Sequence, residues 1–423
     1  MLRSGMLYFA FHCAALAGVP VTIAARRQFL VFASAGAIWF VLRLPRPTSA
    51  KPSFFPCRRS VRWASSRSSR AVRKEPRYGV PAAARRAGAG ARQKPLGVAL
   101  VGLGSLSTNQ IAPALQKTTR CRLAAIVTGT PAKAARWKAQ YGIPDRSVYD
   151  YGTMGRLAEN ADVDIVYVVT PNALHAEHTI AALRAGKHVL CEKPMEVSVA
   201  KCDAMIAAAR AAGRQLAVGY RCQFEPHHVE AARLARERVL GRVRRIDAGL
   251  GFTIGDPTQW RLNRALAGGG PLMDVGIYAL QTALTLAGEA PSAVSATTTR
   301  GDPAKFRDVE ASMTFRLEFP NGVVADCRTS YVENYNGFTA TAERGTFGLG
   351  PAYGYDGIRG TRSDGVPLRF AATDHFAVEL DDFAGRILTN TPTPVPGEMG
   401  RRDVRIMMAA YDSARAGAPV RLA

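Results

Sequence analysis

Hydrophobic and polar positions alternate in two different ways along the chain, and the change falls near residue 220. Between residues 96 and 220, short apolar runs are separated by longer amphipathic stretches with helical spacing. The runs 96–101, 165–169 and 188–191 have the length and uniform apolarity of buried strands. Strands that alternate with helices in this way predict a parallel, doubly wound sheet.

The second part of the chain, residues 221–423, has a period-two pattern instead. Stretches such as VRRIDAGLGFTI and ASMTFRLEFPNGVVADCRTSYV alternate apolar and polar residues, and Asn321-Gly322 is a strong hairpin signal. We expect an α+β domain with a large, mostly antiparallel open sheet. Two amphipathic stretches, DHFAVELDDFAGRIL and GRRDVRIMMAAYDSARAG, predict helices that pack back on the body. The predicted fold class is α/β, followed by this α+β domain.

The basic residues are distributed unevenly along the chain, whose formal net charge is +23. Residues 1–95 hold 18 Lys and Arg and one acidic residue, Glu75. Residues 96–423 hold 38 basic and 32 acidic residues and are only mildly basic. We interpret residues 1–95 as a signal sequence or leader followed by a disordered basic linker.

An apolar run, residues 29–42, follows the pair Arg26-Arg27 in the leader. About 14 residues are too few for a membrane span but suit the core of a signal peptide. The pattern R-R-x-F-L resembles the twin-arginine export signal, and the small residues 48–50 offer a cleavage site. We therefore expect a periplasmic protein with no stable membrane anchor once it is processed. A transit peptide, a cytoplasmic location or a basic arm that touches nucleic acid are the alternatives.

The sequence also indicates which partners and metal sites to expect. No recognisable nucleic-acid module accompanies the basic charge, so we expect no nucleic-acid partner. The seven cysteines are scattered and include no C-x-x-C pair, which predicts neither a disulfide framework nor a structural zinc. His175 and His178 lie together but lack a third and fourth ligand, so we expect no metal.

The turn after the first predicted strand has the chemistry of a dinucleotide site. Gly102 and Gly104 match the first two positions of G-x-G-x-x-G, and Ser107 stands at the third. A helix N-terminus binds a pyrophosphate through its backbone N–H groups, and a glycine lets that backbone approach closely. Residues 96–220 are thus predicted to form an NAD(P)-binding Rossmann domain. Its expected phosphate contacts are Gly102, Leu103, Gly104, Ser105 and Leu106.

The next predicted strand ends without the acidic residue that NAD enzymes place on the ribose. Thr128 stands at or near that position and is followed by Gly129 and Lys133. Hydroxyls and a lysine would accept a 2′-phosphate that a carboxylate would repel, so the sequence favours NADP over NAD. The equally simple alternative is that Thr128 and Thr130 only cap the following helix.

Two polar turns follow the later strands of the predicted sheet. They are Thr170-Pro171-Asn172 and Glu192-Lys193-Pro194. Ligands of a doubly wound sheet bind at the carboxyl ends of its strands. We therefore expect both turns, together with His175, at the cofactor crevice.

A triple-glycine stretch, AGGGPLMDVGIYALQTAL, introduces a helical pattern in the second domain. The spacing places Asp274 and Tyr278 four residues apart on one face. Oxidation of an alcohol by hydride transfer needs a proton acceptor, and a tyrosine serves if a cation lowers its pKa from about 10. Lys193 is such a cation, so Lys193, Asp274 and Tyr278 are the candidate catalytic residues. The structural alternative is a first-turn acid and a core aromatic.

Several stretches together resemble the Gfo/Idh/MocA family of nicotinamide oxidoreductases, over about residues 96–420. They are the G-L-G turn, TPNALHAEHTIAALRAGKHVLCEKPM, VGYRC and GGGPLMDVGIYAL, and the greatest likeness is to the glucose–fructose oxidoreductase group. The resemblance implies the same catalytic residues, with Tyr278 where many relatives have histidine. It also implies places near the cofactor or sugar for Arg221, Trp260 and Arg261, although Trp260 as a core residue is the alternative.

The resemblance further implies an activity and an assembly. We expect an NADP-dependent sugar oxidoreductase that oxidises a glucose-like aldose at C1 to the lactone, with retained NADP reducing a second sugar such as fructose to sorbitol. One alternative is an aldose or dihydrodiol dehydrogenase that exchanges its NADP freely. Another is a nucleotide-binding sensor, which would not need the three candidate catalytic residues. The resemblance implies a dimer or tetramer of identical chains, joined through the open sheet.

Overall fold

The computed structural model describes residues 30–34, 37–41 and 94–422. The chain divides into two units, residues 1–74 and 75–423. In the first unit, β1 (Leu30–Ser34) pairs antiparallel with β2 (Ala37–Val41), inside the run expected to be a signal-peptide core. The Arg26-Arg27 pair, the small residues 48–50 and the predicted linker up to residue 93 lie outside the described residues. No helix in the described ranges is long and apolar enough to cross a membrane.

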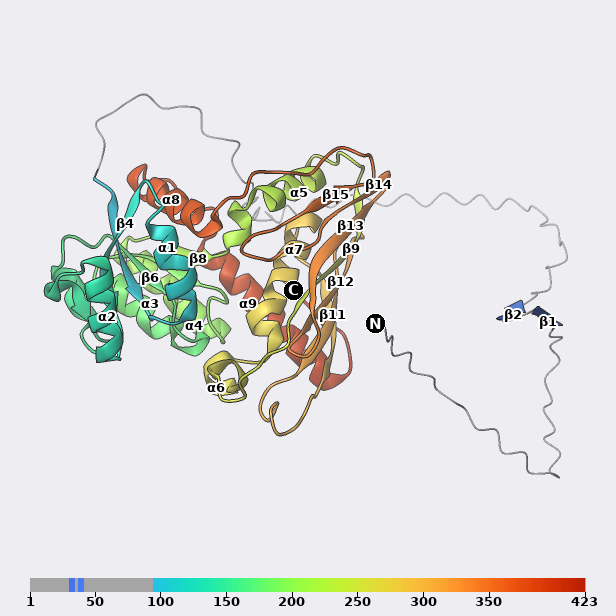
Figure 1. The fold of residues 1–423 in the computed structure, drawn as a ribbon, viewed down its shortest axis with the longest axis horizontal. Coiled ribbons are helices and arrows are strands. Elements are labelled where there is room, and N and C mark those ends of the chain that lie inside the picture. Colours follow the sequence, from blue (N-terminus) through green and yellow to red (C-terminus); the bar gives the residue numbers. More distant parts are fainter. Residues whose placement is uncertain (1–29, 35–36, 42–93, 423) are drawn as a thin grey trace, which may run out of the picture. The chain divides into compact units, whose positions relative to one another are not determined.

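A sheet of six parallel strands forms the first part of the second unit (Figure 1). The strand order is β5-β4-β3-β6-β7-β8, so the chain starts near the centre, builds one side and then crosses to the other. The predicted doubly wound sheet is therefore confirmed. The central strands are apolar almost throughout because both of their faces are buried. The strands are β3 (Leu96–Val101), β4 (Cys121–Val127), β5 (Val148–Tyr149), β6 (Ile165–Val168), β7 (His188–Glu192) and β8 (Leu216–Gly219).

Helices connect these strands and pack on the sheet. A π-helical turn, Ser107–Ile111, leads directly into the short helix α1. Helix α3 packs on β6 and β7 and against α4, and α2 packs on β4. The helices are α1 (Ala112–Leu115), α2 (Pro131–Tyr141), α3 (His175–Arg184) and α4 (Val199–Ala212).

The second sheet has eight strands in the order β15-β14-β13-β9-β12-β11-β10-β16. All neighbours pair antiparallel except β9 and β12, which are parallel. The expected mostly antiparallel open sheet is therefore confirmed, and the turn at Asn321-Gly322 joins β11 to β12 with Gly322 at φ +85°. The strands are β9 (Val243–Gly251), β10 (Ala293–Thr299), β11 (Ser312–Glu318), β12 (Val324–Ser330), β13 (Tyr335–Ala342), β14 (Gly345–Leu349), β15 (Gly360–Arg362) and β16 (Val420–Arg421).

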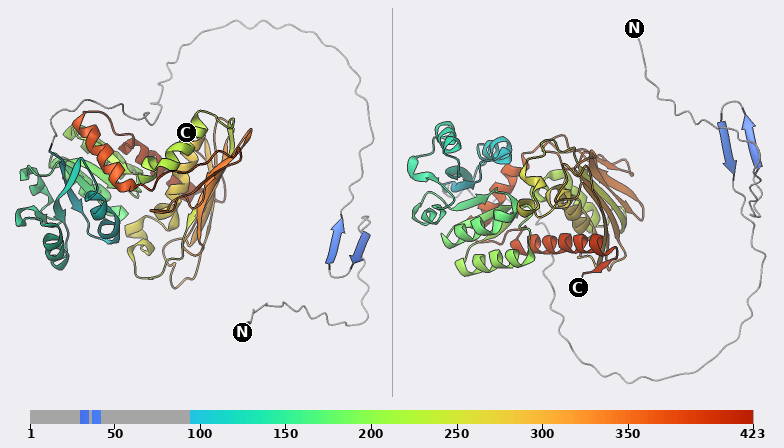
Figure 2. Two further views of the ribbon diagram at one scale, coloured as in Figure 1. Left: turned by 45° about the horizontal axis from the view of Figure 1, so that its top comes forward. Right: turned by 90° about the horizontal axis from the view of Figure 1, so that it is seen from below.

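The helices of the C-terminal part hold the two sheets together. Helix α7 packs on β9, β12 and β13, on the side of the large sheet that faces the parallel sheet (Figure 1). Helix α8 packs on α1 and β4, and the long helix α9 extends from α4 and β8 to β10 (Figure 2). The two predicted C-terminal helices thus return to the body. The helices are α5 (Pro226–Arg236), α6 (Arg264–Ala267), α7 (Ile277–Ala287), α8 (His375–Leu388) and α9 (Gly397–Ala416).

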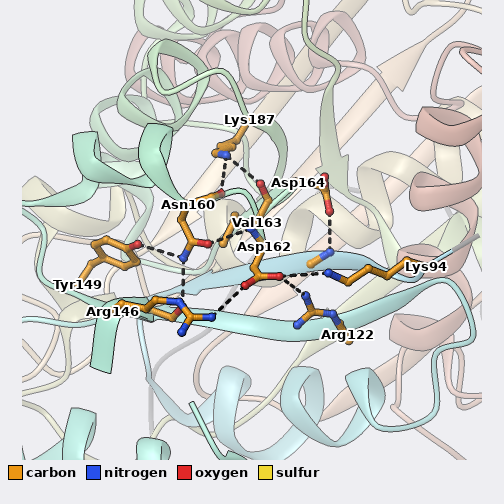
Figure 3. Close-up of polar contacts among 11 residues, drawn as sticks. Lys94, Arg122, Arg146, Tyr149, Asn160, Asp162, Val163, Asp164 and Lys187 are labelled. Atoms are coloured by element: carbon orange, nitrogen blue, oxygen red, sulfur yellow. Dashed lines mark hydrogen bonds and ion pairs between the residues drawn. The ribbon is translucent and has the colours of Figure 1, made fainter. Parts of the chain in front are cut away.

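Polar contacts close the edge of the parallel sheet at which its strands begin (Figure 3). The Asp164 carboxylate, just before β6, accepts a hydrogen bond of 2.8 Å from the Gly97 backbone N–H in β3. Lys187, just before β7, is buried and donates to the carbonyl oxygens of Asn160 and Val163 at 3.0 and 2.8 Å. These contacts fix the strands relative to one another, so that their opposite, carboxyl ends are held in register. Asp162 adds ion pairs to three cations, Lys94, Arg122 and Arg146.

Replacement of Gly97 by alanine tests this edge. A Cβ at Gly97 would lie 1.7 Å from the Asp162 carbonyl oxygen and 2.9 Å from the Ala124 Cβ, so β3 and the chain before β6 would have to separate. We expect Gly97→Ala to lower the free energy of unfolding by about 2–3 kcal/mol and Tm by about 5–10 °C in thermal denaturation. Gly155→Ala is the control, because no atom lies within 4 Å of its added Cβ. Equal Tm values for the two variants would contradict the prediction.

Candidate active site

The turn after β3 combines a strained glycine with an open one. Gly102 has φ +91°, and a Cβ there would lie 2.7 Å from the Val169 carbonyl oxygen, so only glycine fits. At Gly104 no atom lies within 4 Å of an added Cβ, and the residue is exposed. Ser107, at the third glycine position, is fully buried and donates its hydroxyl to the Gly102 carbonyl oxygen at 2.5 Å. The Ser107 hydroxyl therefore closes the turn with a hydrogen bond, at the position where a third glycine would allow close helix–strand packing.

This turn fits the pyrophosphate of a dinucleotide. The helical segment begins at Ser105 and Leu106, and the first backbone N–H groups of a helix have no partner within it. The open space at Gly104 lies at this helix start. Leu103 is buried, so only its backbone is placed to take part.

The end of β4 presents hydroxyl and amine groups. Thr128 is buried, and its hydroxyl oxygen accepts a hydrogen bond of 3.3 Å from the Thr130 N–H. Thr130 is the residue before α2, but its side chain makes no capping hydrogen bond, so side-chain capping by Thr130 does not occur. Lys133 is exposed in the first turn of α2, which contains no acidic residue. Because no carboxylate stands here, a 2′-phosphate meets no repulsion from this turn.

Tyr151 is a residue of this region that the sequence did not single out. It is 41% exposed, and its ring stacks on His178 with centroids 4.8 Å apart and planes 21° apart. Its ring edge also lies 3.2 Å from where a Cβ would stand on Gly129. The ring therefore forms an aromatic wall beside the end of β4. Tyr151 lies in an irregular segment without periodicity, and that is why the sequence pattern did not indicate it.

His175 and Asn172 position the backbone around the crevice. His175 is 1% exposed, with Nε2 2.8 Å from the Thr170 carbonyl oxygen and Nδ1 2.9 Å from the Pro194 carbonyl oxygen. Burial lowers its pKa to about 4. The Asn172 side-chain amide donates to the Ala267 carbonyl oxygen at 2.9 Å. Both were predicted as cofactor contacts, but their side chains are engaged within the protein, so they hold the turns that face the crevice.

Lys193 is anchored by the residue before it. The buried Glu192 carboxylate accepts hydrogen bonds from the Tyr167 hydroxyl at 2.8 Å and from the Lys193 N–H at 3.1 Å. Burial raises the pKa of Glu192, and the charge of Lys193 and the Tyr167 hydrogen bond offset only part of that rise. The Lys193–Pro194 peptide bond is cis. Glu192 thus shapes the loop that carries Lys193.

The Lys193 side chain crosses from the first domain to the second. Its Nζ donates to the Asp274 carbonyl oxygen at 2.7 Å, lies 3.9 Å from the Asp274 Oδ1 atom, and stands 4.7 Å from the centroid of the Tyr278 ring. The Lys193 and Asp274 side chains are each 13% exposed. The three predicted catalytic residues therefore lie together. Asp274 belongs to a π-helical turn, Leu272–Gly276, that precedes α7, and such turns are frequent at functional sites.

Asp274 is held as a carboxylate. Its Oδ2 atom accepts hydrogen bonds from the Arg261 Nε at 2.9 Å and from the Tyr331 hydroxyl at 3.0 Å. Burial raises the pKa of Asp274, but the charges of Arg261 and Lys193 and the Tyr331 hydrogen bond outweigh burial, so the pKa is lowered overall. Arg261, predicted to meet the cofactor, thus pairs with Asp274, and its guanidinium lies 4.7 Å from the ring of half-buried Trp260.

Tyr278 differs from what the sequence predicted. Burial raises the pKa of its hydroxyl, and the charge of Arg221 offsets only part of that rise. The cation that hydrogen-bonds the hydroxyl is Arg221, through Nε at 3.2 Å, whereas Lys193 lies over the ring. The expectation that Lys193 lowers the pKa of Tyr278 below 10 is therefore wrong for this structure.

Arg221, predicted to bind the cofactor, is itself buried and fully engaged. It donates to the carbonyl oxygens of Tyr353 and Gly354 at 2.7 and 3.1 Å and lies 3.0 Å from the His375 Nδ1 atom. Its guanidinium also lies 4.8 Å from the ring of Tyr355, which is 48% exposed. Arg221 therefore positions Tyr278 and the loop that carries Tyr355.

A buried clamp explains the triple glycine before the π-helical turn. The Glu310 carboxylate accepts hydrogen bonds from the Gly270 N–H at 3.0 Å and from the Tyr411 hydroxyl at 2.7 Å. A Cβ at Gly269 would lie 1.9 Å from the Tyr411 hydroxyl oxygen, and one at Gly270 would lie 2.3 Å from the Glu310 carbonyl oxygen. Small residues are therefore required where Glu310 and Tyr411 approach the start of the segment that carries Asp274.

The arrangement suits proton chemistry on a hydroxylated ligand. A half-buried lysine, a carboxylate held ionised and a tyrosine hydroxyl lie around one point at the carboxyl edge of the parallel sheet. A cation and a hydroxyl beside one ligand oxygen stabilise a developing alkoxide and exchange its proton. Among the described residues, no three His, Cys, Asp or Glu side chains are grouped to hold a metal ion.

Removal of the Tyr331 hydroxyl tests the electrostatics of Asp274. Tyr331→Phe deletes one donor to the charged form of the carboxyl, so the pKa of Asp274 should rise by about one unit, measured by NMR titration of carboxyl-labelled aspartate. In the wild type, the lowered pKa means that ionised Asp274 stabilises the fold above pH about 4, and that this stabilisation is lost as pH falls through the lowered pKa.

The matched control for this titration is Tyr353→Phe. The Tyr353 hydroxyl is also buried, but its partner is the Thr282 hydroxyl at 2.8 Å. The pKa of Asp274 should stay unchanged in this variant. An unchanged pKa in Tyr331→Phe as well would refute the assigned hydrogen bond.

Comparison with known proteins places the chain in a family. Two family models match it: "Oxidoreductase family, NAD-binding Rossmann fold" over residues 96–220 and "GFO/IDH/MocA C-terminal domain" over residues 228–347. The D-xylose 1-dehydrogenase [NADP(+)] of Haloarcula marismortui is 30% identical over 78% of this chain and 94% of its own. The D-glucoside 3-dehydrogenase of Escherichia coli is 28% identical over 78% of this chain and 98% of its own.

A solved structure shows the same relationship. The crystal structure of aldose-aldose oxidoreductase from Caulobacter crescentus, complexed with glycerol, has a TM-score of 0.76 and 45% identity, covering 78% of this chain and 100% of the other. These likenesses confirm the resemblance that the sequence motifs indicated, and they extend through both domains. The chain belongs to the Gfo/Idh/MocA family of NAD(P)-dependent oxidoreductases.

Proposed function

We propose that this protein oxidises a glucose-like aldose at C1 to the lactone with NADP, and that it reduces a second sugar on the same bound cofactor. The observation that carries the proposal is the contact of Lys193 with both Asp274 and Tyr278. Support comes from the names of two relatives, an NADP-dependent xylose 1-dehydrogenase and an aldose-aldose oxidoreductase. Fructose as the second sugar rests on the resemblance of the sequence motifs alone.

Each catalytic residue has a role that follows from its surroundings. NADP, when bound, takes up and returns the hydride. The Lys193 amine lies beside the sugar oxygen and stabilises the alkoxide that forms as the proton leaves. Asp274, held ionised by Arg261, orients Lys193 and accepts a hydrogen bond from a sugar hydroxyl.

Tyr278 exchanges the proton in both directions. Because burial raises its pKa, its hydroxyl is protonated at neutral pH and suits donation to a sugar carbonyl during reduction. During oxidation the tyrosinate form is needed, and the charge and hydrogen bond of Arg221 lower the cost of forming it. A tyrosine tuned in this way fits an enzyme that alternates between oxidising one sugar and reducing another.

Sugar specificity belongs to the residues around this point. The Tyr355 ring is half exposed and lies against the Arg221 guanidinium, and the Trp260 ring lies against the Arg261 guanidinium. Both rings flank the catalytic residues from the second domain. We infer that they form walls against the apolar faces of the sugar.

Export and assembly are further parts of the proposal. We propose that the twin-arginine pattern at Arg26-Arg27 directs the folded protein to the periplasm, because a retained cofactor requires folding before export. We also propose that identical chains associate through the face of the large sheet that α7 leaves open. A hollow of about 1070 Å³ lies along that face, and its lining includes Asp247, Arg316 and Tyr335.

Product analysis tests the catalytic proposal. The purified protein is given glucose and fructose with no added nucleotide, and gluconate and sorbitol should accumulate in equal amounts over many turnovers. Product formation only after NADP is added, with NADPH accumulating from an aldose alone, would instead show a freely exchanging dehydrogenase. Absence of any oxidation, with nucleotide still bound, would show a sensor.

The control variants for this experiment separate catalysis from folding. Lys193→Met should lower kcat by about 10²–10⁴-fold, because it removes the cation beside the sugar oxygen, while nucleotide binding remains. Lys201→Met should retain activity, since the Lys201 amine donates to the Glu196 carboxylate at 3.0 Å and to the Ala173 carbonyl oxygen at 3.2 Å, away from the three catalytic residues. Persistent activity in Lys193→Met would refute the proposed catalytic role of Lys193.

Cofactor preference has its own test at the start of α2. Lys133→Ala should weaken binding of NADP by about 10–100-fold and leave NAD binding unchanged, measured by calorimetric titration, because only NADP carries the 2′-phosphate. Lys138→Ala is the control, since Lys138 lies on the same helix but pairs with Asp145 at 2.7 Å. An equal loss for NADP and NAD would contradict the assigned phosphate contact.

A further inference from the structure

Cys222 differs from the other cysteines that the structure describes. Cys121, Cys191, Cys202 and Cys327 are buried, and burial raises the pKa of each thiol. Cys222 is half-buried. Burial raises its pKa as well, but the positive charges of its neighbours outweigh this, and the thiol pKa is lowered overall. Its surroundings therefore favour the thiolate, which is the nucleophilic form of cysteine.

His228 supplies a base for this thiol. The His228 and Cys222 side chains line the same small cavity, and the His228 Nε2 atom lies 2.8 Å from the Ala352 carbonyl oxygen. With Nε2 donating to that carbonyl, the other ring nitrogen is left to take the thiol proton. A nucleophile, a base and a group that orients the base are the three parts of an activated cysteine.

Arg221 adds a positive charge and connects this pair to the sugar site. Its charge lowers the pKa of Cys222, and its Nε atom donates to the Tyr278 hydroxyl at 3.2 Å. Cys222 directly follows Arg221 in the turn after β8. A change at the Cys222 sulfur is thus one residue from the group that holds Tyr278.

A small cavity joins the thiol to the catalytic residues. It measures about 30 Å³ and its lining includes Lys193, Cys222, Gln223, His228, Tyr278 and Thr285. Since a water needs about 10–15 Å³, the cavity admits two or three waters or one molecule of similar size. Hydrogen peroxide, with two heavy atoms, fits this volume.

We propose that Cys222 is an oxidation site for small hydroperoxides, and that its oxidation switches off turnover at the neighbouring sugar site. The Cys222 thiolate attacks one peroxide oxygen, an S–O bond forms, and the O–O bond breaks. The departing hydroxide takes the proton from His228 and leaves as water. Sulfur is oxidised to the sulfenic acid by two electrons, and the peroxide is reduced.

The product acts on Tyr278 through space and charge. The added oxygen occupies the cavity that Tyr278 and Lys193 also line, and the negative charge next to Arg221 is lost. The Arg221 guanidinium and the Tyr278 hydroxyl must then adjust to a new hydrogen-bonding neighbour. The loss of turnover rests on the proposed sugar chemistry, whereas the reactivity of Cys222 does not.

The experiment uses the full chain with Cys13 and Cys57 replaced by serine, so that only the five described cysteines react. After hydrogen peroxide treatment, peptide mass spectrometry should find one added oxygen at Cys222 at least about tenfold faster than at the other four. Sugar turnover should fall at least about tenfold in parallel, and dithiothreitol should restore it. Cys222→Ser should keep its activity before and after treatment.

His228→Gln tests the base and should slow oxidation of Cys222 about tenfold. If this variant fails to fold, the pH dependence of methyl methanethiosulfonate labelling of Cys222 in the parent chain replaces it. Labelling should then be half-maximal well below pH 9.

Oxidation of Cys222 no faster than of the buried cysteines, or equal inactivation of Cys222→Ser, would overturn the proposal. Absence of sugar turnover before treatment would reject the proposed sugar chemistry alone, because the mass measurement still decides whether Cys222 reacts.

Discussion

The contact between Lys193 and Asp274 is the constraint around which the rest of the site is arranged. It joins the loop after β7 to the helical segment before α7, and so it links the two domains at the crevice. Removing two charges from water costs free energy that their attraction alone does not return. The structure offsets that cost with Arg261 and the Tyr331 hydroxyl, which satisfy the remaining carboxylate oxygen.

Supports for this pair come from both domains. In the first domain, His175 ties the turn after β6 to the Pro194 carbonyl, and Glu192 holds the Lys193 backbone. In the second domain, Glu310 and Tyr411 clamp the glycines that precede Asp274. None of these supporting side chains needs to touch a ligand. Their effect is that Lys193 and Asp274 meet at one place, where a 1 Å displacement would be costly to catalysis.

Arg221 is a second centre of contacts, and it joins three separate chain segments at the site. Its guanidinium contacts Tyr278, the loop at 353–354 and His375 at the start of α8. Any change that moves Arg221 therefore moves the proton-exchanging hydroxyl. Cys222 and His228 lie beside Arg221, so oxidation of the single Cys222 sulfur atom makes such a change. Catalytic geometry and sensitivity to oxidation thus share one guanidinium.

The amino-acid sequence by itself determined the features that depend on short-range order. Periodicity predicted both sheets, and the motifs around Gly102, Lys193 and Asp274 indicated the crevice and its chemistry, because turns and helix faces are set within a few residues. Tertiary structure alone decided the partners. The sequence suggested that Arg221 and Arg261 lie near the cofactor or sugar, whereas in the structure they hold Tyr278 and Asp274. Glu310 contacts Tyr411, which is 101 residues away. Burial also reversed the expected pKa direction of Tyr278. Desolvation and contacts between distant residues arise only when the chain has folded, so no local pattern encodes them.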